Sequence, residues 1–382
     1  MHENTHLFPD RMQLYLGAVL MIMALLIGGG LALLPRHSGA AERPPRVAYL
    51  APVHGTPQNI WIADPANPDD AYQVTFSESG IYNFAVSPEG DRIAFAEHNP
   101  DSGTIDLKML NLDDGTITVL VTCPDSECKS PAWNPEGSMI AYERTIVRRN
   151  FSSLNPDPTS IWLLDLRDDP PTTRPLFNNP QILGHSPQWS PGGRRLAFYD
   201  LTSTGIRVYD FRRHDSVLIP SHHDSVGAFS PDGTQMAYLE IQVRESSGTH
   251  TRVRLADLTT GTTAPLDSPD EPVDDERVVW SPDGRYLALG RRYTDERYTP
   301  GRQIYRFDLE TGEAEPLVVD AGYYHGYFAW DASGRWLVFQ RFPDPGAQPD
   351  ANDIHPEVWT VDTISGTLSK IATDVFLPQW VP

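Results

Sequence analysis

The sequence predicts an all-β fold: a seven-bladed β-propeller of four-stranded antiparallel blades, preceded by one N-terminal transmembrane helix. Three observations predict the propeller. A hairpin motif recurs along the chain, further strands follow each copy, and incomplete copies stand at the two ends. A propeller arranges one small sheet after another around a centre, so a repeat of roughly 40–50 residues is typical of it.

The recurring hairpin is clear in residues 278–292, VVWSPDGRYLALGRR, where two runs of alternating apolar and polar residues flank a turn. Ser at the first turn position can bond back to the backbone, Pro sets φ at the second, and Gly at the fourth permits a positive φ. The copy at 331–334, DASG, lacks the Pro but keeps an acid and the Gly. The apolar residues before the turns are spaced by roughly 40–56 residues, and they are Val86, Trp133, Trp189, Phe229, Trp280, Trp330 and Trp380.

Two more strands are expected after each hairpin. The third strands read as alternating segments that often end in Asp and a polar turn. They are expected at 104–112, 160–166, 205–211, 251–258, 302–309 and 357–363, and a fourth strand follows the first of them at 116–123.

The two chain ends are expected to share one blade. Residues 46–50, 59–64 and 71–76 look like the last three strands of a blade, and 377–381 looks like a first strand with nothing after it. Pairing of 377–381 with 46–50 would close the ring, which removes two exposed strand edges.

The motif WSPDGRYLA, followed downstream by I-Y-x-x-D-x-x-T-G, resembles the WD40-like (PD40-type) repeats of the TolB-like propeller family. The resemblance covers about residues 46–382 and implies architecture rather than activity, because propellers host many functions. Similar repeats form the propellers of prolyl oligopeptidase and dipeptidyl-peptidase relatives. TolB itself has six blades behind a separate α/β domain, whereas this sequence predicts seven blades and no such domain.

The N-terminal region divides into a tail (1–13), an uncharged apolar segment (14–34) and a linker (35–45), ahead of the propeller (46–382). At about 1.5 Å per residue the apolar segment would span a bilayer, and it is longer than a usual signal core. We favour a retained anchor. Cleavage after the small residues 38–40 is the alternative.

The propeller is expected outside the cytoplasm. Arg11 lies before the apolar segment, while Arg36, Arg43 and Arg46 follow it, so the charge rule alone would put the propeller inside. TolB-like chains are normally exported, however, and the apolar segment sits where a signal sequence would. Cys123 and Cys128, the only cysteines, either form a disulfide, which an outside location permits, or remain free thiols.

The formal net charge of the chain is −21. Residues 1–45 contain as many arginines as acids, so all of this charge lies on the propeller. Such a surface disfavours nucleic acid and anionic lipid. It suits basic partners or cations, or simply confers solubility.

Catalytic motifs are missing from the sequence. It has no G-x-S-x-G elbow, H-E-x-x-H, P-loop or C-x-x-C pair, so we expect no cofactor, no metal and, on balance, no enzyme. Asp344, Asp350, Asp353 and His355 could hold a divalent cation, but a solvated loop is the preferred interpretation.

A candidate binding site follows from the architecture. The loops that enter the first strand of each blade should converge on one mouth of the propeller, where aromatic, His and carboxylate side chains would form a pocket. The His residues there are expected to titrate near neutrality, with neighbouring carboxylates raising their pKa values. The candidate residues are Tyr82, Lys129, His185, His223, Asp224, Asp275, Glu276, Tyr324, His325 and Tyr327.

These observations predict a membrane-tethered, extracytoplasmic propeller that acts as a binding or scaffold module for a protein, peptide or glycan. Two alternatives stay open. One is an accessory or sensor subunit of a membrane complex. The other is a lyase or hydrolase with a His and carboxylate site at the mouth.

Overall fold

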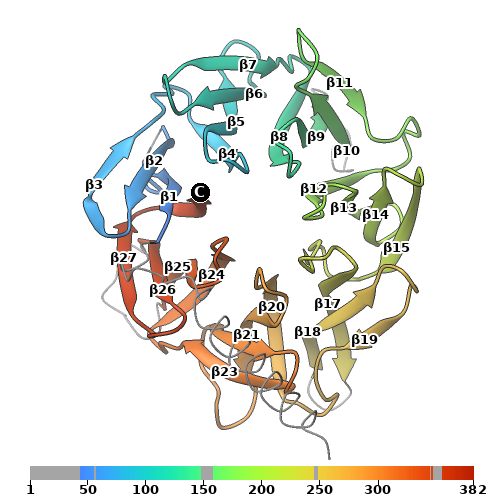
Figure 1. The fold of residues 1–382 in the computed structure, drawn as a ribbon, viewed down its shortest axis with the longest axis vertical. Helices are drawn as coiled ribbons and strands as arrows, with labels where there is room; N and C mark the ends of the chain where they lie inside the picture. Colours follow the sequence, from blue (N-terminus) through green and yellow to red (C-terminus); the bar gives the residue numbers. More distant parts are fainter. Residues whose placement is uncertain (1–43, 56, 148–157, 245–247, 345, 347–354) are drawn as a thin grey trace, which may run out of the picture. The chain divides into compact units, whose positions relative to one another are not determined.

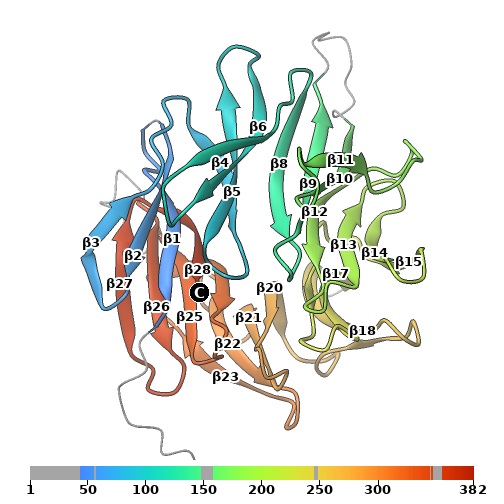
Figure 2. The same cartoon turned by 45° about the horizontal axis from the view of Figure 1, so that its top comes forward.

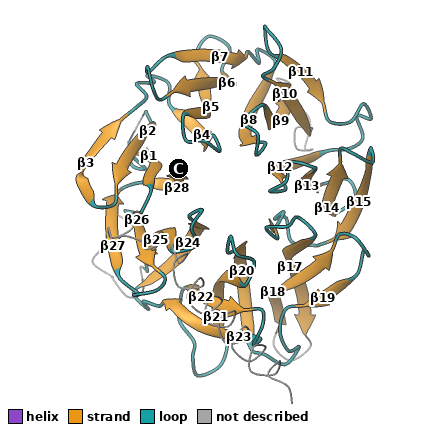
Figure 3. Ribbon diagram, viewed as in Figure 1, coloured by secondary structure: helices purple, strands orange, loops and turns teal. Residues whose placement is uncertain are grey.

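The structure, a computed structural model, describes residues 44–382 except 56, 148–157, 245–247, 345 and 347–354. The expected anchor at 14–34 therefore lies outside the described residues. Within the described part, strands are joined by turns and loops, and no helix is present (Figure 3). That part accordingly contains no helix with the length and apolar character needed to cross a membrane.

The strands form six sheets, which are antiparallel apart from one bridge, and each sheet is named here by its strands. The first contains both chain ends: β28 (Phe376–Val381), β1 (Arg46–Ala51), β2 (Asn59–Asp64) and β3 (Asn67–Gln73). Four further four-stranded sheets follow the chain order. They are β12 (Gly184–Trp189), β13 (Arg195–Asp200), β14 (Gly205–Asp210) and β15 (Asp215–Pro220); β16 (Ala228–Phe229), β17 (Gln235–Arg244), β18 (Gly248–Asp257) and β19 (Thr263–Pro265); β20 (Val273–Trp280), β21 (Tyr286–Tyr293), β22 (Gln303–Asp308) and β23 (Glu313–Val318); and β24 (Tyr323–Trp330), β25 (Trp336–Pro343), β26 (Glu357–Asp362) and β27 (Leu368–Thr373).

The remaining sheet has eight strands. It consists of β4 (Ile81–Val86), β5 (Arg92–Asn99), β6 (Thr104–Asn111), β7 (Ile117–Val121), β8 (Ser126–Trp133), β9 (Met139–Ile146), β10 (Thr159–Asp165) and β11 (Thr172–Pro175). Two four-stranded units are joined here because Ile105 of β6 forms a parallel bridge with Glu127 of β8. Two separate four-stranded sheets were expected here, and this bridge joins them into one.

Within residues 44–382 the sheets are arranged around a central opening, and the first strand of each motif copy lies innermost (Figure 1). The predicted pairing of the C-terminal strand with 46–50 is confirmed. β28 runs antiparallel to β1, with Arg46 opposite Val381 and Leu50 opposite Phe376 (Figure 2). The apolar core is divided between neighbouring sheets. Ala48 and Val381 of the first sheet, for example, pack with Phe84 and Ile93 of the next.

The repeated turn works as the sequence predicts. The first turn residue accepts a hydrogen bond from the backbone N–H five residues on, at 2.9 Å for Ser87, Ser190 and Ser281. Asp331 replaces Ser in the copy without Pro, and its carboxylate makes the same bond at 2.7 Å. The fourth residue, as at Gly284 and Gly334, has a φ of 76° and 74°, which a side chain would resist.

The repeated Trp joins neighbouring sheets. Its indole Nε1–H donates across to the backbone carbonyl of an Ala on the preceding inner strand, at 3.0 to 3.1 Å. The pairs are Trp133 with Ala85, Trp189 with Ala132, Trp280 with Ala228, and Trp380 with Ala329. Trp330 is the exception. On the preceding inner strand Val279 takes the place of the Ala, and the buried Nε1 of Trp330 has no hydrogen-bond partner among the described residues.

This difference yields a paired test. Trp380→Phe removes a donor and leaves the Ala329 carbonyl without it, whereas Trp330→Phe removes a donor that makes no bond. Both tryptophans are partly buried against an apolar cluster, so Trp380→Phe should cost about 1 kcal/mol more free energy of unfolding than Trp330→Phe. Urea denaturation of both variants measures the difference. Equal costs would contradict a stabilising role for the intersheet bond.

Candidate functional site

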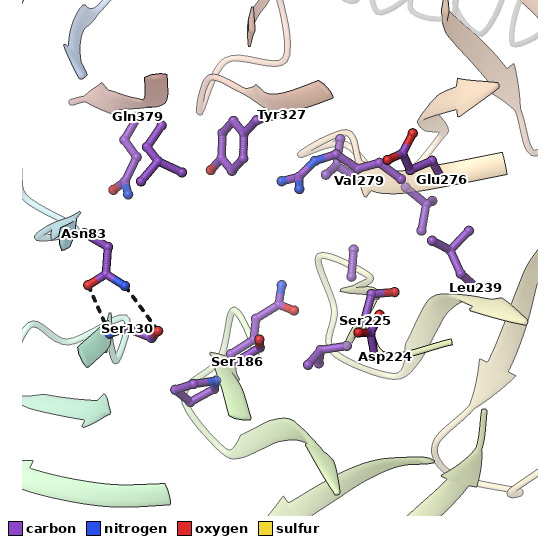
Figure 4. Close-up of a pocket in the computed structure, with 18 of the residues that line it drawn as sticks. Asn83, Ser130, Ser186, Asp224, Ser225, Leu239, Glu276, Val279, Tyr327 and Gln379 are labelled. Carbon is purple, nitrogen blue, oxygen red and sulfur yellow. Dashed lines mark hydrogen bonds between the residues drawn. The ribbon is translucent and has the colours of Figure 1, made fainter. Parts of the chain in front are cut away.

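A cavity of 580 Å³ lies at the central opening, in the size range of ligand-binding pockets. Each inner strand, or the residues just before it, contributes to the lining of this cavity (Figure 4). The lining residues are Asn83, Phe84, Ser130, Pro131, Ser186, Pro187, Gln188, Asp224, Ser225, Val226, Gly227, Ala228, Leu239, Glu276, Arg277, Val278, Val279, Tyr327, Leu377 and Gln379.

The inner strands are bulged where they line the cavity. Their pairing register shifts between Lys129 and Ala132, between His185 and Gln188, and between His325 and Phe328. A bulge inserts an extra residue and re-aims its side chain. In all seven copies, a residue that lines the cavity stands three places before the apolar residue that precedes the hairpin turn. These lining residues are Asn83, Ser130, Ser186, Val226, Arg277, Tyr327 and Leu377. Three of them, Ser130, Ser186 and Leu377, have φ values of 55°, 58° and 53°.

Arg277 and Tyr327 form the most distinctive pair in this ring. The Arg277 guanidinium carbon lies 4.1 Å from the centre of the Tyr327 ring, a cation–π arrangement. Arg277 Nε donates to the Phe328 carbonyl at 3.3 Å. Burial lowers the pKa of Arg277, although Tyr327 and Glu276 oppose the shift, and a guanidinium stays charged at neutral pH. The pair therefore presents a fixed positive charge beside an aromatic ring.

The opposite charge comes from the exposed carboxylates of Asp224 and Glu276, which line the same cavity. Small polar groups complete the wall. Asn83 and Ser130 hold each other through two hydrogen bonds of 3.0 and 3.2 Å, drawn as dashed lines in Figure 4. The backbone N–H of Ser186 donates to Glu143 Oε1 at 2.8 Å. A ligand with both acidic and basic groups would find complementary charges here.

Three predicted residues, Asp224, Glu276 and Tyr327, line the cavity. Others lie just outside its lining. His185 and His223 bond through Nδ1 to the hydroxyls of Ser186 and Ser225, at 2.9 and 2.8 Å, and both serines belong to the lining.

The remaining aromatic and basic candidates pack locally. Tyr82 is 48% exposed, and the Lys129 ammonium lies 5.5 Å from its ring centre. Tyr324 stacks on Phe342 with ring centres 5.1 Å apart. Neither Tyr82, Lys129 nor Tyr324 lines the cavity.

Asp275 and His325 were predicted to be accessible side chains of the binding pocket, and this prediction is wrong. Asp275 is fully buried and forms an ion pair with Arg291 at 2.7 Å. His325 is 2% exposed. In β20 the buried Asp275 is followed at once by Glu276, which lines the cavity, as alternation along a strand requires. In β24 a bulge between His325 and Phe328 separates the buried imidazole from Tyr327, which lines the cavity. The sequence patterns placed the binding site on the loops that enter the inner strands. In the structure, Arg277 and most of the other ring residues that line the cavity belong to the strands themselves.

The expectation of a raised pKa is also wrong for His325. Burial, helped by the nearby charge of Arg341, lowers its pKa to about 4, although the carbonyl of Arg302 and the charge of Asp320 oppose the shift. The imidazole is therefore neutral at physiological pH and belongs to the packing between strands.

Cys123 and Cys128 form a disulfide, which is the first of the two alternatives that the sequence left open. Both residues are fully buried. The bridge links the residues that follow β7 to strand β8, two residues before the cavity residue Ser130.

The buried His325 predicts a dependence of stability on pH. Between pH 6.5 and about 4 the unfolded chain binds a proton at this residue while the folded protein does not, so stability falls as the pH falls through this window. The full effect is about 3 kcal/mol. His325→Phe should remove this component. Urea denaturation at pH 7 and pH 4.5 would compare the two proteins, and an equal loss of stability in both would contradict the assignment.

No family model matches the sequence. A stretch of 111 residues is 32% identical to an uncharacterized peptidase, YuxL, of Bacillus subtilis, and it covers 29% of this chain and 16% of that protein. The chain thus matches only a small part of the length of this curated relative.

Solved structures resemble the chain over most of its length. The β-propeller domain of the Trilobed protease from Pyrococcus furiosus has a TM-score of 0.57 and 15% identity, over 87% of this chain and 93% of that one. TolB from Acinetobacter baumannii has a TM-score of 0.50 and 15% identity, over 88% and 67%.

The fold is a TolB-like β-propeller.

Oligogalacturonate lyase from Vibrio parahaemolyticus also resembles the propeller, with a TM-score of 0.56 and 12% identity over 77% of this chain and 87% of that one. At such identities the likeness concerns the fold alone. The same propeller fold occurs in a protease, in TolB and in a lyase, so the activity has to be argued from the cavity.

Proposed function

We propose that the protein is a membrane-tethered, extracytoplasmic propeller that captures a segment of a protein partner in the cavity at its centre. The observation that carries the proposal is the Arg277–Tyr327 pair, which faces a cavity that also holds Asp224 and Glu276. Arginine and tyrosine are the residue types that most often dominate protein recognition.

A peptide segment suits this cavity better than a small apolar ligand. A carboxylate of the partner would meet Arg277, and a basic side chain would meet Asp224 or Glu276. Ring stacking on Tyr327 adds apolar contact without much loss of side-chain entropy. The net charge of −21 further favours a partner with a basic surface.

We further propose that the ring has seven blades, with the eight-stranded sheet counted as two. The support is that β4–β7 and β8–β11 each contain one motif copy, and that a single parallel bridge joins them. Each of the seven inner strands then contributes one residue to the ring around the cavity.

An enzyme is the second candidate, because His185 and His223 each contact a serine hydroxyl of the cavity wall. A serine nucleophile needs a base that is itself oriented by a third group. Among the described residues, neither imidazole makes an ion pair with a carboxylate. The binding function is therefore the better supported of the two, and an accessory or sensor role in a membrane complex is one form that such binding could take.

The binding proposal is tested by a matched pair of variants. Arg277 and Arg285 each lie over a tyrosine ring, Tyr327 and Tyr286 respectively, but Arg285 follows the hairpin turn at the far end of β20, away from the cavity. Arg277→Gln should reduce partner capture at least tenfold, because a buried charged contact is lost. Arg285→Gln should leave capture unchanged. Affinity purification from native membranes with quantitative mass spectrometry measures capture, and melting curves verify folding. Full capture by Arg277→Gln together with loss in Arg285→Gln would overturn the proposal.

The membrane tether has its own test. If residues 14–34 are a retained anchor, the full chain should sediment with membranes and resist high-salt and carbonate washes. Added protease should reach the propeller from the extracytoplasmic side only. A soluble protein that begins near Ala41 would show cleavage instead, and protection from external protease would place the propeller inside.

A further inference from the structure

Two histidines and an aspartate meet where the first and last parts of the propeller come together. His54 follows β1, His355 precedes β26, and Asp374 lies between β27 and β28. One potential ligand atom from each residue lies within 4.8 Å of the other two. His54 Nδ1 is 2.6 Å and His355 Nδ1 is 3.2 Å from the same carboxylate oxygen, Asp374 Oδ1.

Backbone hydrogen bonds hold this group in place. The Asp374 carbonyl accepts from Val53 N–H at 2.9 Å, and the Asp374 N–H donates to the Pro356 carbonyl at 2.8 Å. The His54 N–H also donates to the Asp374 carboxylate at 3.1 Å. Asp374 therefore bonds to the neighbours of both histidines. Its φ of 63° is a backbone conformation that Asp and Asn adopt more readily than most residues.

The donor set suits a transition metal. Neutral imidazole nitrogens and a carboxylate oxygen are the ligands that zinc accepts at about 2.0–2.2 Å, with water at an open fourth position. Ligand atoms around such an ion lie roughly 3.3 Å apart. The 3.2 Å contact already has this spacing, the 2.6 Å contact would have to open, and a pair near the 4.8 Å limit of the group would have to close. The side chains of His54 and His355 are 43% and 40% exposed, which gives an ion and its water access.

We propose that His54, His355 and Asp374 bind a divalent transition-metal ion, best fitted by zinc, and that the ion fastens the closure of the propeller. His54 and Asp374 are 320 residues apart in the chain and flank the two strands that pair at the closure, β1 and β28. A metal bond between them would oppose the separation of these strands. This site is distinct from the cavity, whose lining contains none of the three residues.

The first experiment measures binding of zinc to the full chain in detergent micelles by isothermal titration calorimetry, after treatment with a chelator. One ion per chain should bind to the wild type. The double variant His54→Ala with His355→Ala should lose this binding at least a hundredfold. Asp374→Asn should weaken it at least tenfold, because Asn keeps the backbone conformation but removes the charge.

His222→Ala is the matched control. His222 also contacts a carboxylate through Nδ1, at 2.9 Å from Glu240, but no third ligand of this kind is grouped with them among the described residues. Zinc binding should be unchanged in this variant. No binding to the wild type, or equal binding to the wild type and the double variant, would overturn the proposal and leave the three residues as a hydrogen-bonded latch.

A second measurement tests the role at the closure. Hydrogen–deuterium exchange of β28 should slow when zinc is added to the wild type, and the melting temperature should rise by roughly 3–5 °C at a hundredfold excess over Kd. The double variant should show neither change. Zinc binding without slower exchange in β28 would refute the fastening role, even if the metal site itself exists.

Discussion

The antiparallel pairing of β28 with β1 is the constraint on which the rest of the structure depends. β28 is the innermost strand of a sheet whose other strands come from the start of the chain. It is also bonded to both neighbouring sheets, since Trp380 donates to the Ala329 carbonyl and Gln379 donates to the Phe84 carbonyl at 2.7 Å. The six residues of β28 thus join three sheets. Without them the ring would be open, with a strand edge exposed on each side of the gap.

The cavity depends on the same closure. Leu377 and Gln379 of β28 form part of its wall, next to Asn83 on one side and Tyr327 on the other (Figure 4). The hydrogen bonds from the tryptophan indoles to the neighbouring inner strands fix the spacing of those strands. Bulges just before the tryptophans, as between Lys129 and Ala132, turn a side chain of the inner strand into the opening. Glu276 and Arg277 are thereby held on the paired strand β20, whereas Asp224 lies in the loop before β16.

The hairpins, their turns and the closure could be predicted from the sequence because each rests on local patterns: alternation, Ser-Pro-Asp-Gly turns and incomplete copies at the ends. The site was predicted only in part. Asp224, Glu276 and Tyr327 were among the chosen residues, whereas Arg277, which follows the register shift in β20 and also lines the cavity, was not chosen. Asp275 and His325 look like surface residues in the sequence, and only the packing between sheets buries them. Likewise, nothing in the sequence relates His54 to His355 and Asp374 before the ring is closed.

The central claim, that the cavity is where the partner binds, is tested most directly by photocrosslinking in native membranes. A photoreactive phenylalanine analogue would replace Tyr327 in the cavity wall or, as the comparison, Tyr286 beside the hairpin turn at the other end of the inner strand. The account predicts that one partner protein is crosslinked from position 327 and none from position 286. Crosslinks to a partner from position 286 alone would contradict it.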